Sequence, residues 1–187
     1  MLFSFDQKIA LKTKLYNLFR EMDELPIFMC VGVDSVVIDS LGPIVGEMLK
    51  KKYAVPAYVY GDLDYTITAG NIDYVASFIS IMHPRAKICV IDASVGNVEE
   101  RGYIKLVEGG VMPAGLTKQN PKVIGDMALL GVVATHGFRD KISLNNIKMQ
   151  EVLSMAEVIA WAISQAIAEI DYNENEEVIA KQEYMYI

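Results

Sequence analysis

Apolar residues recur along this chain with two different periods. Over residues 4–24 they fall three and four positions apart among charged side chains, which is the spacing of an amphipathic helix. Pro26 ends that helix, and the continuous apolar run over residues 27–33 predicts a short strand buried on both faces. Residues 40–52 return to helical spacing, so the chain opens as helix, strand, helix.

The same alternation continues beyond the second helix. Residues 57–60 predict a strand, residues 72–82 a helix and residues 86–91 a third strand. Strands that alternate with helices predict a mostly parallel sheet covered on both faces, so we expect a three-layer α/β/α fold. The rest of the chain predicts a strand, a loop, another strand and a long helix, at residues 103–107, 109–121, 127–135 and 149–170.

The chain length limits the domain organisation. A chain of 187 residues can bury one α/β core but is too short for two ordinary domains and a linker, so we expect one domain over residues 1–187. In that domain the N-terminal helix covers about residues 4–24, and an acidic C-terminal tail covers about residues 171–187.

Composition and charge exclude several classes of function. Charged residues or Gly interrupt the apolar runs before they reach the roughly 18 residues of a spanning helix, and the N-terminus lacks the pattern of a signal peptide. We therefore expect a cytoplasmic protein without a membrane partner. The net charge of −7, with one cluster of cations at Lys50, Lys51 and Lys52, argues against a nucleic-acid partner. Cys30 and Cys89 lie within apolar runs, which predicts buried side chains rather than a metal or redox pair.

Acidic residues predominate where the predicted strands end. In open α/β sheets, ligands bind beyond the carboxyl ends of the strands. Here those positions hold Asp34, Asp39, Asp62, Asp64, Asp92 and His136. No glycine-rich dinucleotide or phosphate-binding motif follows the first strand, and no Gly-x-Ser-x-Gly nucleophile motif is present. The pattern therefore favours carboxylate chemistry at this edge.

Asp39 and Asp92 each have a plain structural explanation. Asp39 precedes a predicted helix and suits its N-cap, and an Asp after a strand, such as Asp92, commonly caps a turn. For each residue taken singly, capping is the favoured interpretation. However, the first and third strands of such a sheet commonly lie side by side, which would bring the two carboxylates together. Two carboxylates in one site can act as acid and base, because one keeps a proton while the other stays ionised.

Three segments carry a family resemblance. CVGVDSVVIDSLGP at residues 30–43, VYGDLD at residues 59–64 and CVIDASVG at residues 89–96 resemble the YyaC-like family of sporulation-associated proteases. These proteases are relatives of germination protease and, more distantly, of the hydrogenase maturation peptidases. The resemblance covers most of residues 26–165 and implies a phosphorylase/hydrolase-like (maturation-peptidase-like) α/β fold. It also implies an aspartate-dependent peptidase that acts on a protein or peptide in a sporulating cell or spore, and that assembles as a homo-oligomer.

The resemblance assigns roles to particular residues. Asp39 and Asp92 stand where germination protease has its catalytic carboxylates. Further residues are expected to support the site or bind substrate: Asp34, Asp62, Asn71, Lys122 and His136.

Two alternatives stay open. The maturation peptidases hold a nickel or similar ion with two acidic residues and a His. Asp39 and Asp92 match the acidic residues, but Lys122 stands where those enzymes have the His, so a divalent metal site would need His136 instead. We therefore expect no cofactor and rank a metal-dependent maturation peptidase last. The other alternative is a non-catalytic sporulation regulator that uses the same fold and its acidic tail to hold a partner.

Overall fold

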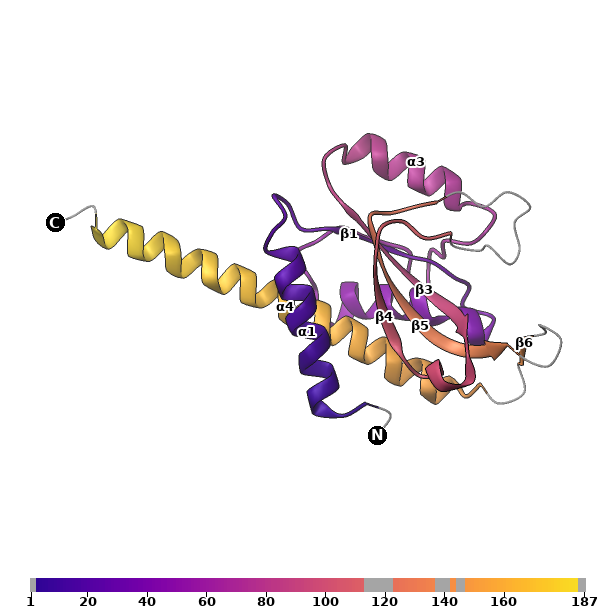
Figure 1. Cartoon of the computed structure of the whole chain (residues 1–187). Coiled ribbons are helices and arrows are strands. Elements are labelled where there is room, and N and C mark those ends of the chain that lie inside the picture. The colour runs from indigo at the N-terminus through magenta and orange to yellow at the C-terminus, as the bar shows by residue number, and fades with distance from the viewer. Residues whose placement is uncertain (1–2, 113–122, 137–141, 144–146, 185–187) are drawn as a thin grey trace.

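The computed structural model describes residues 3–112, 123–136, 142–143 and 147–184 (Figure 1). The helical elements are α1 (Phe5–Phe19), the 3-10 turn η1 (Val37–Asp39), α2 (Leu41–Glu47), the π-helical turn η2 (Met48–Lys52), α3 (Ile72–Met82), the 3-10 turn η3 (Val98–Glu100) and α4 (Met149–Tyr184). The strands are β1 (Ile27–Cys30), β2 (Val59–Tyr60), β3 (Ile88–Gly96), β4 (Ile104–Glu108), β5 (Met127–His136) and β6 (Ile142–Ser143).

The strands form one sheet in the order β2-β1-β3-β5-β4, and β6 pairs with β5 outside this path. β2, β1, β3 and β5 run parallel, whereas β4 and β6 run antiparallel to β5. The prediction of a mostly parallel sheet is confirmed. The first and third strands of the chain, β1 and β3, lie side by side as predicted.

Helices cover both faces of this sheet. Figure 1 shows α1 and α4 on one side of the sheet and α3 on the other. Side chains alternate between the two faces along each strand. In β1, Phe28 and Cys30 join the apolar cluster that contains α1, α2 and α4, while Ile27 and Met29 join the cluster that contains α3. The three-layer α/β/α fold is therefore confirmed, and both cysteines are buried as predicted.

Several element ends differ from the predicted ones. α3 matches its predicted range, but α1 ends at Phe19 and β1 ends at Cys30. β3 continues past its predicted end at Ile91 as far as Gly96, because those residues pair with β5.

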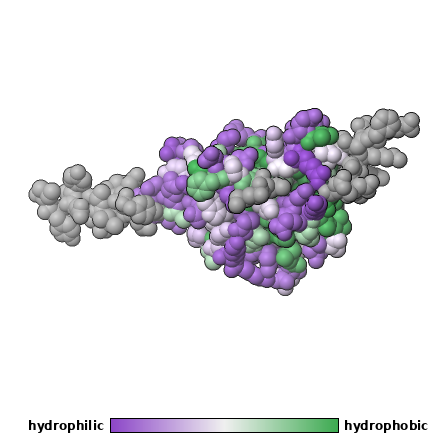
Figure 2. Space-filling model, turned by 90° about the horizontal axis from the view of Figure 1, so that it is seen from below, coloured by the Kyte–Doolittle hydropathy of each residue, from purple (hydrophilic) through white to green (hydrophobic). Residues whose placement is uncertain are grey.

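α4 is longer than the predicted helix and continues to Tyr184, through the segment where a tail was expected. Figure 1 shows its C-terminal part extending past the rest of the fold. By length and composition alone, Met149–Asp171 could cross a membrane, so this helix is more apolar than the sequence interpretation allowed. It packs in one cluster with α1 and α2, which is the arrangement of a core helix. Seen from below, the described surface mixes hydrophilic and hydrophobic residues (Figure 2).

Candidate active site

The strand order of the sheet reverses between β1 and β3. From β1 the chain crosses to β2 on one side, while β3 leads to β4 and β5 on the other side. In open parallel sheets, ligands bind beyond the carboxyl ends of the strands at such a reversal. The last registered pair of β1 and β3 is Cys30 with Ile91, and β3 continues beyond it along β5. Side chains just beyond that pair therefore occupy the position of a binding site.

A tightly closed loop after β1 brings Asp39 back to the strand end. The amide of Val33 donates a hydrogen bond to the carbonyl of Asp39 (3.0 Å) and closes the loop. Gly32 has a φ of +139°, and a Cβ at this position would lie 1.9 Å from the carbonyl oxygen of Asp39. Glycine is the residue that permits both the backbone angle and the close approach. This packing explains the spacing from Gly32 to Asp39.

Asp39 is not the N-cap of the following helix. α2 begins at Leu41, and its N-cap position is Ser40, whose side chain makes no capping hydrogen bond. The hydroxyl of Ser40 instead donates to the carbonyl of Val37 (3.0 Å). Asp39 is the last residue of η1 and is partly buried. The capping interpretation of Asp39 is therefore wrong.

Asp92 lies inside β3 rather than after it. It is the first residue of β3 beyond the last pair with β1, and it pairs with Leu130 of β5. The residue is 8% exposed, and its Oδ1 accepts a hydrogen bond from the amide of Ala93 (2.8 Å). A residue within a strand does not cap a turn, so the turn-capping interpretation of Asp92 is wrong.

The two aspartates lie near enough to interact electrostatically. Burial, and secondarily the charge of Asp39, raises the pKa of Asp92 from its ordinary value of 3.8 to about 7, although the amide of Ala93 opposes this shift. Burial also raises the pKa of Asp39, against the opposing effect of the Val33 amide. As pH rises, the less buried Asp39 loses its proton first and Asp92 retains its own for longer. The pair can therefore hold one proton and one negative charge close to neutral pH.

Ser94 is a polar residue at this edge that the sequence interpretation missed. It lies two residues after Asp92 in β3, so the two side chains point to the same face of the sheet, roughly 7 Å apart along the strand. Its hydroxyl oxygen is buried and has no hydrogen-bond partner among the described residues. Buried hydroxyls are usually hydrogen-bonded, so Ser94 holds an unused donor beside Asp92. A strand predicted as far as Gly96 would have indicated Ser94, because alternate residues of a strand share a face and Ser94 then lies on the same face as Asp92.

The other predicted site residues are distributed differently. Asp34 is exposed in the turn after β1. Asn71 accepts a hydrogen bond from the amide of Thr68 (2.7 Å) and so closes its own loop. Lys122 lies outside the described residues, and so does the side chain of His136, whose backbone ends β5. The supporting roles of these residues stay predictions.

Comparison with known proteins places the chain in a family. Residues 4–162 match the family described as "Protein of unknown function (DUF1256)". The chain belongs to the DUF1256 family. It is 33% identical over 156 residues to the uncharacterized protein YyaC of Bacillus subtilis (strain 168), a match that spans 82% of this chain and 76% of that protein. The YyaC-like resemblance is therefore confirmed.

No solved structure matches the chain. The finer assignment to the phosphorylase/hydrolase-like fold therefore stays a prediction. The descriptions of the DUF1256 family and of YyaC name no activity, so the chemistry rests on the site itself.

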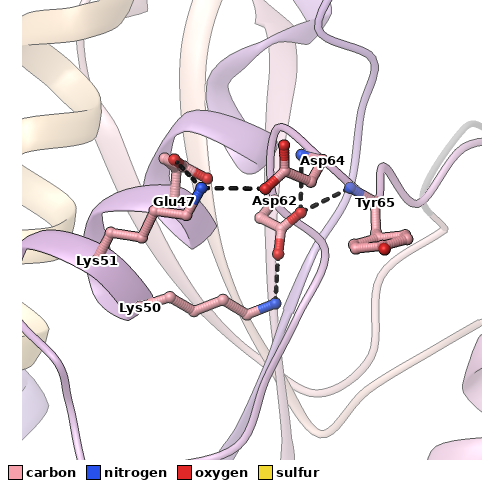
Figure 3. A network of polar contacts seen from close by, with 6 residues as sticks. All are labelled: Glu47, Lys50, Lys51, Asp62, Asp64 and Tyr65. Carbon is pink, nitrogen blue, oxygen red and sulfur yellow. Dashed lines mark hydrogen bonds and ion pairs between the residues drawn. The ribbon is translucent and has the colours of Figure 1, made fainter.

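Asp62 belongs to a separate ionic network beside β2 (Figure 3). It is 5% exposed, and its carboxylate pairs with the Lys50 ammonium (2.5 Å) and accepts the amides of Asp64 (2.9 Å) and Tyr65 (2.6 Å). Burial would raise the pKa of Asp62, but Lys50 and these amides outweigh it and hold the pKa below its ordinary value. In this DUF1256 protein, Asp62 therefore ties η2 to the loop after β2.

Glu47, Asp62 and Asp64 form a candidate metal-binding group, with carboxylate oxygens within 4.8 Å of one another. Lys51 already bridges two of them, because its ammonium lies 2.7 Å from Glu47 and 3.0 Å from Asp64 (Figure 3). Lys50 pairs with the third. The two ammonium groups neutralise most of the negative charge that would attract a cation, so this group fits a metal poorly. The metal ligands suggested by the sequence, Asp39, Asp92 and His136, lie elsewhere, and the side chain of His136 is outside the described residues.

Lys50→Met is expected to lower the free energy of unfolding by about 2 kcal/mol, because it leaves the buried Asp62 carboxylate without its cation. Arg85→Met is the control, since it breaks an exposed ion pair: Arg85 is 84% exposed and its partner Glu24 is 48% exposed. Exposed pairs contribute little, so the control is expected to change stability by less than about 1 kcal/mol. Urea unfolding measures both variants. Equal losses would contradict the structural role of Asp62.

A cavity of about 730 Å³ lies apart from the aspartates, between α1, β4, β5 and α4. Neither Asp39 nor Asp92 lines it. Two of its polar lining residues, Arg101 and Glu151, pair with each other (2.8 Å). Its size suits a small ligand, but the cavity does not include the two carboxyl groups at the strand-order reversal. The aspartate pair is therefore the candidate active site.

Proposed function

We propose that this protein is an aspartate-dependent peptidase whose catalytic groups are Asp39 and Asp92. One observation carries the proposal: a buried carboxyl group with a pKa of about 7 lies near a second, less buried carboxyl group where the strand order reverses. Carboxyl groups perturbed in this way are concentrated at catalytic sites. The resemblance to germination protease supports peptide-bond hydrolysis as the reaction.

The different environments of the two carboxyl groups assign their roles. Asp92 is the more buried and keeps its proton up to a pKa of about 7, so it acts as the general acid. Asp39 ionises at lower pH and acts as the general base. The Ser94 hydroxyl donates a hydrogen bond to the carbonyl oxygen of the substrate, beside Asp92.

In the proposed reaction, Asp39 takes a proton from a water molecule while the water oxygen attacks the carbonyl carbon of the peptide bond. Asp92 gives its proton to the departing nitrogen as the carbon–nitrogen bond breaks, which releases an amine and a carboxylic acid. Transfer of the proton from Asp39 to Asp92 then restores the starting state. The net reaction consumes one water molecule for each peptide bond.

The resemblance to sporulation-associated proteases supports a cellular setting as well. On that ground we place the substrate among the proteins of the sporulating cell, and the peptidase in the cytoplasm of that cell. The substrate is then a folded or unfolded protein rather than a small molecule.

Asp39→Asn is expected to reduce cleavage by at least about 100-fold, because a general base typically contributes that much or more. The purified protein is incubated with an extract of sporulating cells that lack it, and new protein N-termini are counted by mass spectrometry. Asp23→Asn is the matched control, because Asp23 is exposed and precedes β1, at the opposite end of the strand. The control is expected to cleave like the wild type.

Cleavage is also expected to fall as pH rises through about 7, since Asp92 then loses the proton that it must donate. The proposal fails if the wild type generates no new N-termini, and that outcome favours the non-catalytic regulator. It also fails if Asp39→Asn and Asp23→Asn cleave equally well.

A further inference from the structure

α3 carries large apolar side chains on its outer side as well as on its inner side, and a polar stripe of Asp73, Ser77 and Ser80 lies between them. Its inner side buries Ile72 and Ile79 in the cluster against the sheet. Its outer side exposes large side chains at helical spacing, and these define the outer α3 face: Tyr74 (75% exposed), Phe78 (41%), Ile81 (77%) and Met82 (56%). Large apolar side chains that gather on an exposed surface mark an interaction site. In Figure 1, no other described helix lies on this side of the sheet.

The apolar surface continues past the end of the helix. The ring of Tyr58, which is 63% exposed, lies 4.3 Å from the ring of His83. His83 in turn is hydrogen-bonded to the hydroxyl of Tyr60 (2.8 Å). The hydroxyls of Ser77 and Ser80 donate to carbonyls of their own helix (2.8 Å and 2.9 Å). The surface therefore presents large apolar and aromatic side chains, and the hydroxyls of Ser77 and Ser80 beside them already have partners within the helix.

The outer α3 face is also uncharged. The charged residue of α3, Asp73, is in its first turn, and residues 74–82 contain no Asp, Glu, Lys or Arg, although the whole chain carries a net charge of −7. Two copies of an acidic chain repel each other, so a neutral face is where they approach at the lowest electrostatic cost. A membrane surface suits this face less well, because helices that lie on membranes carry Lys and Arg beside their apolar side. At 11 residues, α3 is also too short to cross a bilayer.

We propose that the outer α3 face is the interface of a homodimer, in which α3 packs against α3 of a second copy across a two-fold axis. A two-fold contact needs a surface that complements itself. A neutral apolar helix face meets this condition because apolar packing requires no matching charges or donors. Two helices pack in this way at about 8–10 Å between their axes.

The exposed area is of the right order for a dimer. A fully exposed aromatic side chain presents about 150–250 Å². With the exposed fractions above, the outer α3 face and Tyr58 together offer roughly 600 Å². Each partner of a standard interface buries about 800 Å². Contacts made by the neighbouring turns of α3 and by the loop before β2 would supply the remainder. This inference is independent of the peptidase proposal.

Light scattering after size-exclusion chromatography tests the proposal. The wild type is expected to have twice the 20.8 kDa mass of one chain. Ile81→Glu is expected to be monomeric, because a charge in an apolar interface weakens association by at least about 100-fold. Val98→Glu is the matched control, since Val98 is 70% exposed in η3 and makes the same charge change elsewhere. The control is expected to stay dimeric.

Cross-linking locates the interface directly. Cys30 and Cys89 are buried, so Ser77→Cys adds an exposed thiol on α3. A copper–phenanthroline oxidant is expected to join two such thiols into a disulfide-linked dimer, while Val98→Cys stays unlinked. The proposal is overturned if the wild type is monomeric up to its highest soluble concentration, or if Ile81→Glu remains dimeric. It is also overturned if a monomeric wild type binds phosphatidylcholine vesicles through this face.

Discussion

Replacing Asp92 with Asn is expected to stabilise the folded protein at about pH 8 by about 4 kcal/mol. The carboxyl group of Asp92 has a pKa of about 7 in the folded protein and an ordinary value of 3.8. At a pH between these two pKa values, Asp92 is protonated in the folded protein but ionised in the unfolded chain. The free energy of unfolding of the wild type therefore falls as pH rises from about 4 to about 7. Above about pH 7 the buried carboxyl group of Asp92 is ionised, and the full free-energy cost of burying its charge then lowers the stability of the wild type. An Asn side chain never ionises and avoids this cost.

Urea unfolding at two pH values measures this effect. The advantage of Asp92→Asn over the wild type is expected to widen by about 2 kcal/mol between about pH 5.5 and pH 8. Both conditions lie above the isoelectric point of about 4.9, where solubility is lowest. The exposed Asp23→Asn variant is the control, and its stability is expected to follow the wild type at both pH values. A difference that does not change with pH would contradict a buried, protonated Asp92.

The same substitution is expected to stop cleavage, since an amide cannot donate the proton of a carboxylic acid. A gain in stability that accompanies a loss of activity distinguishes a functional carboxyl group from a structural one. A capping aspartate behaves in the opposite way, because its removal typically costs about 1 kcal/mol. Asp92 therefore costs the fold stability that, on the proposal, serves catalysis.

The layers of the fold could be predicted because their causes are local. Strands buried on both faces require continuous apolar runs, and the helices between them show their inner sides at helical spacing. Adjacent first and third strands follow from the common topology of such sheets, and this adjacency joined Asp39 and Asp92 in one hypothesis. That part of the candidate site was accessible from the sequence.

The end of β3 could not be predicted because a distant segment holds it in place. The residues from Asp92 to Gly96 pair with β5, which lies more than thirty positions further along the chain, from Leu130 to Thr135. No local pattern marks such pairing, so the sequence predicts a strand that ends before Asp92 and does not single out Ser94. In the same way, the sequence does not show that Lys50 reaches Asp62.

The glycines around α2 did not fit any phosphate-binding motif, and the structure gives them a packing role. A Cβ on Gly42 would lie 2.0 Å from the carbonyl oxygen of Val31, and a Cβ on Gly46 would lie 1.9 Å from that of Gly61. The backbone of α2 therefore rests directly on the end of β1 and on the loop after β2. This close contact also fixes the loop that carries Asp39, because that loop joins the two elements.

Gly42→Ala is therefore expected to lower the free energy of unfolding by about 3 kcal/mol or more, since the clash is with backbone that cannot rotate away. In a helix without neighbours the same change stabilises by about 1 kcal/mol, so the sign of the effect reports the contact. Gly70→Ala is the control, because its nearest contact would be the Thr68 hydroxyl at 3.6 Å, and it is expected to change stability by less than about 0.5 kcal/mol. Urea unfolding compares the two variants. If Gly42→Ala were as stable as the wild type, α2 would not rest on Val31, and the position of Asp39 would not depend on that contact.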